Sequence, residues 1–273
     1  METAVTLRFP QYIEEHKHLL APPVCNKMIH NDGKLRVMIV GGPNQRKDYH
    51  VNQGEEFFYQ IKGDMCLKVV EQGVPKDIVI KEGQCFNLPG SIPHSPQRFE
   101  NTIGLVIERL RPADQLDGLR YYVDDTNTAT LWQRYFHVTD LGVQLKPLIE
   151  SFFASEENRT RVPAGDLPAC AFPDDVATST EAPFPLADKV KELKEGDKGH
   201  VTVFDAKEFK ISLVGSQPPP PIPTESWVWQ LEGSSTVNGT ALLAGQTHIC
   251  AKIDDWATSG ADCVALLLFT VAV

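Results

Sequence analysis

The fold is decided by the stretch GGPNQRKDYHVNQGEEFFYQIKG at residues 41–63, together with EGQCFNLPGSIPHSPQRF at residues 82–99. Each combines a short apolar run with turns rich in glycine and proline, which is typical of antiparallel strands. The tripeptide Lys62-Gly63-Asp64 separates two such runs and predicts a hairpin. Similar runs recur about every ten residues between Leu35 and Arg111, and this spacing predicts a β-sandwich or barrel.

Outside this region the pattern changes twice. Helical periodicity is found near the start, at residues 10–20, and again at residues 140–155. Five prolines among small and acidic residues follow at 163–185, and this composition predicts a linker. We therefore expect three parts: a catalytic domain at 1–163, a Pro-rich linker at 164–182 and a second β-rich domain at 183–273.

The second β-rich stretch weakly repeats the first. VWQLEGSS at 228–235 aligns with FYQIKGDM at 58–65, and AGQ at 244–246 aligns with EGQ at 82–84. Shared hairpin chemistry could give such matches by chance. Because both occur in the same order, we favour an internal duplication that places two small β-barrels in one chain.

Composition narrows the class of function. The 273 residues carry 26 Lys and Arg against 36 Asp and Glu, a net charge of −10, which disfavours nucleic acid or an anionic membrane as partner. The six cysteines form no CxxC pair, so zinc-ribbon and thioredoxin-like sites lose their usual signature. The start does not resemble a secretory leader, and the apolar run at 263–273 is shorter than the roughly 20 residues of a membrane helix. We expect that run to be a buried strand, and the protein to be cytosolic.

A group of candidate metal ligands lies in the two opening segments: His50, Glu56 and His94. Two imidazoles and one carboxylate form the facial triad of non-heme Fe(II) oxygenases, which leaves positions open for substrate and O₂. Such a triplet carries little weight by itself in a chain with eight histidines. Its significance depends on the spacing of the residues around it.

That spacing resembles the two motifs of the cupin superfamily. The first runs His-x-His, three or four residues, Glu, six residues, Gly, and this chain has His50-x-Asn52, three residues, Glu56, six residues and Gly63. The second runs Gly, five residues, Pro-x-Gly, two residues, His, and this chain has Gly83, five residues, Pro89-x-Ser91, two residues and His94. Asn52 replaces a fourth ligand, and Ser91 replaces a turn glycine. In the second repeat the aligned positions hold Pro220, Ser226 and Trp256, so we expect that barrel to be degenerate and metal-free.

Three further charged residues accompany the triad. Arg46 lies four residues before His50, and Arg98 lies four residues after His94. In an extended chain an even spacing keeps side chains on one face, so both guanidinium groups should point where the ligands point. Glu108 ends the next apolar run, TIGLVIE. Two arginines and a glutamate beside a metal favour a small substrate that carries a carboxylate and a protonatable group.

More extended motifs resemble the animal 3-hydroxyanthranilate 3,4-dioxygenase family. They are PPVCNK (22–27), RKDYH (46–50), GEEFFYQIKGDM (54–65), IPHSPQRF (92–99), NTIGLVIERLR (101–111) and LDGLRYYVDDT (116–126). The resemblance is dense over about 20–160 and continues more thinly through PFPL (183–186) and WQLEGSS (229–235). It implies an all-β fold of two cupin (jelly-roll-like) barrels with a few peripheral helices. It also implies a monomer with a degenerate second domain, and the missing CxxC excludes the cysteine-bound iron of bacterial members.

The resemblance assigns a role to each site residue. His50, Glu56 and His94 would hold Fe(II), with Glu56 also beside the substrate. Arg98 would bind the substrate carboxylate, Glu108 would contact its amino or hydroxyl group, and Arg46 would stabilise bound O₂. The implied reaction opens the ring of 3-hydroxyanthranilate to 2-amino-3-carboxymuconate semialdehyde, the precursor of quinolinate and NAD in tryptophan catabolism.

Two other readings stay open on the residues alone. One is a cupin of another activity, such as a metal-dependent sugar isomerase, which would normally keep a fourth ligand where Asn52 stands. The other is a non-catalytic storage or binding cupin, whose sign is the loss of ligands. The second half of the chain shows that loss and the first half does not.

Overall fold

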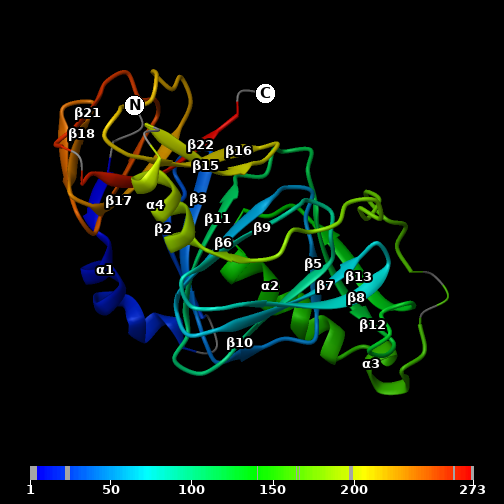
Figure 1. Ribbon diagram of the computed structural model, residues 1–273. Helices are drawn as coiled ribbons and strands as arrows, with labels where there is room; N and C mark the ends of the chain where they lie inside the picture. Colours follow the sequence, from blue (N-terminus) through cyan, green and yellow to red (C-terminus); the bar gives the residue numbers. More distant parts are fainter. Residues whose placement is uncertain are drawn as a thin grey trace.

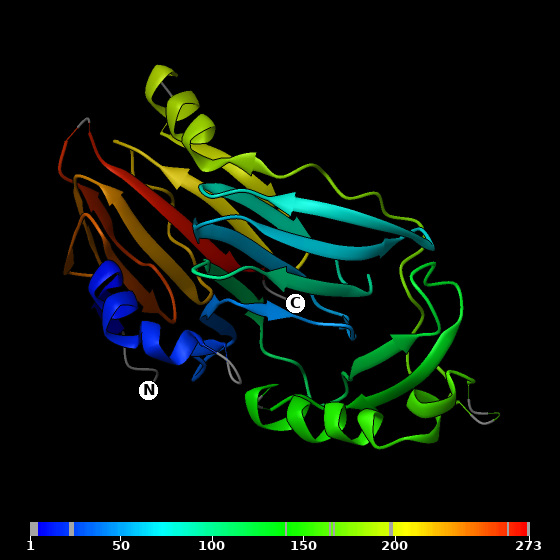
Figure 2. The same ribbon diagram turned by 90° about the horizontal axis from the view of Figure 1, so that it is seen from below.

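The computed structural model describes residues 5–21, 25–139, 141–163, 165, 167–196, 199–260 and 262–271. The first three residues of the PPVCNK motif and two positions at the start of the expected linker, 164 and 166, lie outside this part. The described chain is built mainly from antiparallel strands in two barrels that lie side by side, with helices at the periphery (Figures 1 and 2). The all-β prediction is confirmed. Among the described helices, none is long and apolar enough to cross a membrane.

The first barrel consists of two sheets. One contains, in order, β14 (Phe184–Pro185), β9 (Gln84–Leu88), β6 (Glu56–Lys62), β11 (Ile103–Arg109), β3 (Leu35–Gly41) and β2 (Asn26–His30). The other contains β13 (Thr130–Phe136), β12 (Asp117–Tyr122), β5 (Tyr49–Val51), β10 (His94–Arg98), β7 (Met65–Glu71) and β8 (Val74–Ile80), with β4 (Asn44–Gln45) paired to β10. The strands expected from the apolar runs are therefore present.

The second barrel is smaller and follows the same plan. Its main sheet has the order β1 (Val5–Arg8), β20 (Gln246–Cys250), β17 (Ser226–Glu232), β22 (Val264–Thr270), β16 (Phe209–Val214) and β15 (His200–Asp205). A three-stranded sheet, β19 (Thr240–Leu243), β18 (Ser234–Val237) and β21 (Trp256–Thr258), closes the other side. Within the apolar run at 263–273, residues 264–270 form β22, and all of them except Phe269 are buried, as predicted. Residues 272 and 273 lie outside the described part of the chain.

Alternation along the shared strands sends side chains into two different cores. On β11, Leu105 and Ile107 belong to a large cluster that joins the two barrels, whereas Val106 belongs to the interior of the first barrel. On β6, Phe57 and Phe58 divide in the same way. Because successive side chains of a strand point to opposite faces, Glu56 shares the inward face with Phe58, and Glu108 shares it with Val106.

The two repeats share backbone contacts as well as sequence. The N–H of Gly83 donates to the carbonyl of Gln60 at 2.8 Å, and the N–H of Gly245 donates to the carbonyl of Gln230 at the same distance. All the aligned glycines have left-handed φ angles, with values of +78° at Gly83 and +81° at Gly245. These contacts occur in the aligned order, which supports the internal duplication.

Two edge strands cross between the barrels. Val5 of β1 pairs with Ile249 of β20, so the N-terminal strand lies in the second barrel. Phe184 of β14 pairs with Cys85 of β9, so the strand that follows the linker lies in the first. The division at residues 163 and 183 stays a prediction about sequence units, and these short strands tie the two units together.

The helices lie at the edges. They are α1 (Phe9–His16), a 3₁₀ turn (Lys17–Leu20), α2 (Leu141–Phe153), α3 (Glu156–Thr160) and α4 (Leu186–Glu195). The expected helices at 10–20 and 140–155 are thus present with slightly different ends. Helix α2 packs Leu145, Leu148 and Ile149 against the aromatic cluster of β12 and β13, which places it along one side of the first barrel (Figure 2).

Candidate metal centre and substrate cavity

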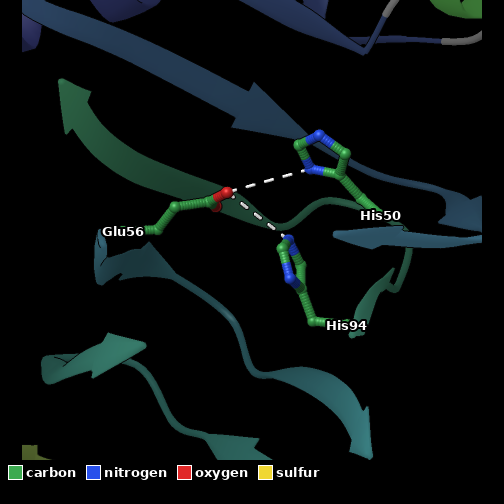
Figure 3. A group of neighbouring side chains, drawn as sticks. All are labelled: His50, Glu56 and His94. Carbon is green, nitrogen blue, oxygen red and sulfur yellow. Dashed lines mark ion pairs between the residues drawn. The ribbon is translucent and has the colours of Figure 1, made fainter. Parts of the chain in front are cut away.

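The three predicted ligands come together inside the first barrel. His50 lies in the middle of β5 and is the antiparallel partner of His94, the first residue of β10. Glu56 opens β6 in the facing sheet, and its carboxylate points between the two imidazole rings (Figure 3). Among the described residues these three form the one group whose possible ligand atoms all lie within 4.8 Å of one another, and all three are buried.

The hydrogen bonds of the two histidines direct their free nitrogens toward Glu56. Nδ1 of His94 lies 3.0 Å from the carbonyl of Ile92 and must donate to it, so Nε2, 3.4 Å from Glu56 Oε1, is left as the acceptor. Nε2 of His50 lies 2.6 Å from the carboxylate of Asp117, so Nδ1, 3.9 Å from Glu56, is likewise free. Burial acts to raise the pKa of Glu56, but in the protonated form of the histidines the charge of His94, its hydrogen bond to Glu56 and the charge of His50 lower this pKa to about 2.

Two nitrogen lone pairs and a carboxylate that face one another in a buried site require a cation between them. Protons on the imidazoles or a metal ion can supply it. The donor set of two imidazoles and one carboxylate is that of a mononuclear non-heme iron centre, so the residues present fit such a metal.

A cavity of about 420 Å³ opens beside these residues. It is lined by the whole predicted site: Arg46, His50, Glu56, His94, Arg98 and Glu108. Its apolar lining consists of Cys25, Met38, Val40, Phe58, Pro96, Val106, Leu145 and Ile149. A cavity lined by both charged and apolar side chains suits a small aromatic acid.

Arg98 is an unpaired cation in this cavity. It is 5% exposed, its Nε has no hydrogen-bond partner, and within the described part of the chain it forms no ion pair. Burial, together with the neighbouring Arg46, lowers the pKa of Arg98 to about 10, so the guanidinium is still charged at neutral pH. A buried charge without a partner is costly, and an anionic ligand would supply the missing partner.

Glu108 faces the same cavity from β11. Its Oε2 binds Nη2 of Arg111 at 2.9 Å, whereas its Oε1 is buried without a partner. Burial raises the pKa of Glu108, and Arg111 opposes that effect. One carboxylate oxygen is thus held in place and the other is available to a ligand.

Arg46 reaches the cavity, but it is not free. Its Nε lies 3.2 and 3.0 Å from the two carboxylate oxygens of Asp48, and Nη2 binds the same group. Asp48 is itself buried, which fixes the guanidinium in one orientation. The even spacing in the sequence predicted that Arg46 and Arg98 point to the same side as the ligands, and in the structure both line the cavity with them.

Three residues that support the site were not predicted from the sequence: Asp48, Arg111 and Asp117. Arg111 donates to Asp117 through Nε at 3.0 Å and Nη2 at 3.1 Å. Burial acts to raise the pKa of Asp117, but the hydrogen bond from His50 and the charge of Arg111 lower it to about 2. All three residues stand in the quoted motifs as charges next to apolar runs, and this was the only available signal.

The two departures from the cupin motifs lie in different loops and are joined by a hydrogen bond. Ser91 has a φ of +63°, the left-handed conformation that glycine adopts without strain. Its N–H donates to the carbonyl of Asn52 at 2.6 Å, and the amide of Asn52 donates to the carbonyl of Gly54 at 3.3 Å. The expected fourth-ligand position therefore supports the turn that carries His94.

In the second barrel the aligned positions have a different environment. Ser226 opens β17 as Glu56 opens β6, and Trp256 opens β21 as His94 opens β10. Both are buried, and Trp256 packs in an apolar core with Val237 and Leu242.

The fold and the site together define a cupin with a buried His-Glu-His centre. The model of the family described as 3-hydroxyanthranilic acid dioxygenase matches residues 1–153. A relative named 3-hydroxyanthranilate 3,4-dioxygenase from Nematostella vectensis is 50% identical over 230 residues, 84% of either chain. Proteins of the same name from Rattus norvegicus and Homo sapiens are 45% and 43% identical, over 91% and 83% of this chain and 87% and 80% of theirs.

The chain belongs to this family of dioxygenases, as its motifs predicted. The fold has a counterpart in a solved structure, a cupin 2 conserved barrel domain protein from Leptotrichia buccalis, with a TM-score of 0.51 at 10% identity. That match covers 99% of this chain and 98% of the other. It supports the cupin fold.

Proposed function

We propose that this enzyme opens the aromatic ring of 3-hydroxyanthranilate with O₂ to give 2-amino-3-carboxymuconate semialdehyde, using Fe(II) held by His50, Glu56 and His94. Both atoms of O₂ enter the product, which closes without an enzyme to quinolinate, an NAD precursor. Fe(II), when bound, supplies positions for the hydroxyl and amino groups of the substrate and for O₂, and it couples the electrons of the ring to O₂.

The observation that carries the substrate assignment is the unpaired Arg98 in the triad cavity. Its guanidinium binds the carboxylate of the substrate, which fixes the ring against the apolar lining formed in part by Met38 and Val106. The hydroxyl and amino groups on the adjacent ring carbons then face the centre, with Glu56 at the boundary between centre and substrate.

Glu108 and Arg46 complete the arrangement. The free Oε1 of Glu108 accepts a proton or a hydrogen bond from the hydroxyl or amino group as the ring is activated. Arg46, oriented by Asp48, places positive charge on the side of the cavity where we place O₂. We predict further that the enzyme works as a cytosolic monomer.

The test combines metal analysis with oxygen uptake. Wild-type protein should hold one equivalent of Fe(II) and consume O₂ with 3-hydroxyanthranilate, whereas His50→Ala and His94→Ala should lose metal and activity together because three ligands leave no redundancy. His200→Ala, at an exposed position of β15, is the matched control. Metal retained at wild-type stoichiometry in both ligand variants would contradict the triad. Turnover of a sugar substrate without O₂ would favour the isomerase alternative.

A further inference from the structure

The ligand Glu56 is preceded by a segment that the first barrel does not hold by strand pairing. Residues 52–55 lie between β5 and β6 outside any strand, and Glu56 is the first residue of β6. Glu55, directly before the ligand, is a charged side chain that is only 8% exposed. A buried carboxylate needs hydrogen-bond donors, and here they come from the other barrel.

Glu55 and Glu208 form a reciprocal pair across the two barrels, which we call the inter-barrel clasp. The carboxylate of Glu55 accepts the backbone N–H groups of Lys207 at 3.0 Å and Glu208 at 2.9 Å. In return the backbone N–H of Glu55 donates to Oε2 of Glu208 at 2.9 Å. Lys207 and Glu208 lie in the turn between β15 and β16 of the second barrel.

The clasp is close to both acidic groups of the site. Oε1 of Glu208 lies 3.7 Å from Nη1 of Arg109, the residue after Glu108. Residue 54 is a glycine, and a Cβ there would lie 2.9 Å from Oε2 of Glu208, so the Glu208 carboxylate would have to shift to admit a side chain. The carbonyl of Glu208 accepts the N–H of Val271 at 2.9 Å, so the turn is itself anchored to the end of β22.

We propose that Glu55 and Glu208 are positioning residues through which the second barrel fixes Glu56. The proposal rests on the function proposed above, in which Glu56 is a metal ligand. A carboxylate that accepts backbone N–H groups forms strong, directional hydrogen bonds, and the bond to the N–H of Glu55 fixes the chain one residue before the ligand. Without it, Glu56 would keep its ladder to β9 on one edge and to β11 on the other, but the residue before it would lose the hydrogen bond that fixes where the strand begins.

The clasp could also serve only to hold the two barrels together, and a second contact in the same interface provides a control for that role. Glu225 is a buried carboxylate of the second barrel that accepts the backbone N–H of Leu35 at 2.9 Å and that of Lys34. It provides the same kind of inter-barrel contact, but to the start of β3, where no predicted ligand stands. If the clasp only holds the barrels together, loss of Glu208 and loss of Glu225 should affect metal affinity equally. If it positions Glu56, loss of Glu208 should lower metal affinity more.

The experiment is an anaerobic titration of the full chain with Fe(II) or Co(II), read by calorimetry and by the Co(II) ligand-field spectrum, with thermal unfolding alongside. Glu208→Ala should weaken metal binding about 10-fold or more, the scale found for groups that orient ligands, and should change the Co(II) spectrum. Glu208→Gln should retain most of the affinity, because an amide oxygen still accepts the N–H of Glu55. Glu225→Ala should lower Tm and keep wild-type metal affinity.

If Glu208→Ala does not fold, the same titration of Glu55→Gln tests the proposal. The glutamine has nearly the same shape, but its amide N–H faces one of the two backbone N–H groups that the Glu55 carboxylate accepts. Wild-type metal affinity and Co(II) spectrum in Glu208→Ala and Glu55→Gln would overturn the proposal. An equal loss of affinity in Glu225→Ala at an equal loss of Tm would also overturn it. Wild-type protein that binds no metal would instead refute the proposed function.

Discussion

Asp117 lies directly behind His50 and receives a hydrogen bond of 2.6 Å from its Nε2. The same carboxylate accepts hydrogen bonds from Nε and Nη2 of Arg111, and Nη2 of Arg111 also lies 2.9 Å from Oε2 of Glu108. One buried guanidinium therefore connects the carboxylate behind a metal ligand with the carboxylate beside the substrate. In the function proposed above, metal coordination and substrate orientation therefore share a single support.

We expect Asp117→Asn to weaken metal binding about 10- to 100-fold, because the amide can face its N–H toward His50 and no longer fixes the ring. Anaerobic titration with Fe(II) measures the effect. Asp174→Asn is the matched control, since Asp174 also forms a two-bonded pair with an arginine, Arg120, away from the centre. Equal affinities in Asp117→Asn and wild type would show that the bond to His50 does not orient the ligand.

Arg98→Ala should leave the metal in place and weaken binding of 3-hydroxyanthranilate by about 2–5 kcal/mol, the usual cost when a buried charged partner is lost. Arg98→Lys should recover only part of this, since a lysine cannot form the two-bonded contact. Anaerobic calorimetry gives the affinities. Binding of 2-aminophenol, which lacks the carboxylate, should be nearly the same in wild type and variant. If the variant bound both compounds like wild type, the carboxylate would be bound elsewhere.

Glu108→Gln keeps the shape and the contact to Arg111 but removes the charge and the basicity. We expect kcat to fall about 10²-fold or more, the scale of a positioned acid–base group, with normal metal content and a weakened but measurable substrate affinity. Steady-state oxygen uptake gives kcat, and metal analysis is the control. Full turnover in this variant would move the proton-accepting role to Glu56 or to water.

Acid should destabilise the interface between the barrels. Burial lowers the pKa of His30 on β2 to about 4, with His248 on β20 adding to that effect and Asp32 opposing it. Burial also lowers the pKa of His248. The folded-state pKa of His30 is below its unfolded value of about 6.5. The contribution of neutral His30 to the free energy of unfolding is therefore complete above pH 6.5 and is lost as the pH falls toward 4.

The free energy of unfolding should therefore drop by about 2 kcal/mol from His30 between pH 7 and pH 5. Urea unfolding at the two pH values measures the drop. His30→Asn should reduce this difference, whereas His200→Asn, at an exposed position, should not. An unchanged difference in His30→Asn would assign the acid sensitivity to other groups.

The sequence predicted those parts of the site that depend on spacing within one strand or turn. Alternation placed Arg46 and Arg98 on the ligand side, and the apolar run before Glu108 predicted its strand. The supporting residues could not be predicted in this way. Asp117 lies 67 residues from His50, and Glu208 lies 153 residues from Glu55. Local pattern gives the face of a strand, but it does not determine which distant segment will contact that face.

The pairing of β1 with β20 affects the order in which the molecule is completed. Thr6 binds His248, a residue 242 positions further along the chain. During synthesis the first strand therefore leaves the ribosome long before its partner exists, although domains generally fold from the N-terminal end. Strand β1 is therefore among the last to be paired, and a nascent chain that stops before β20 leaves β1 without its partner strand and open to proteases.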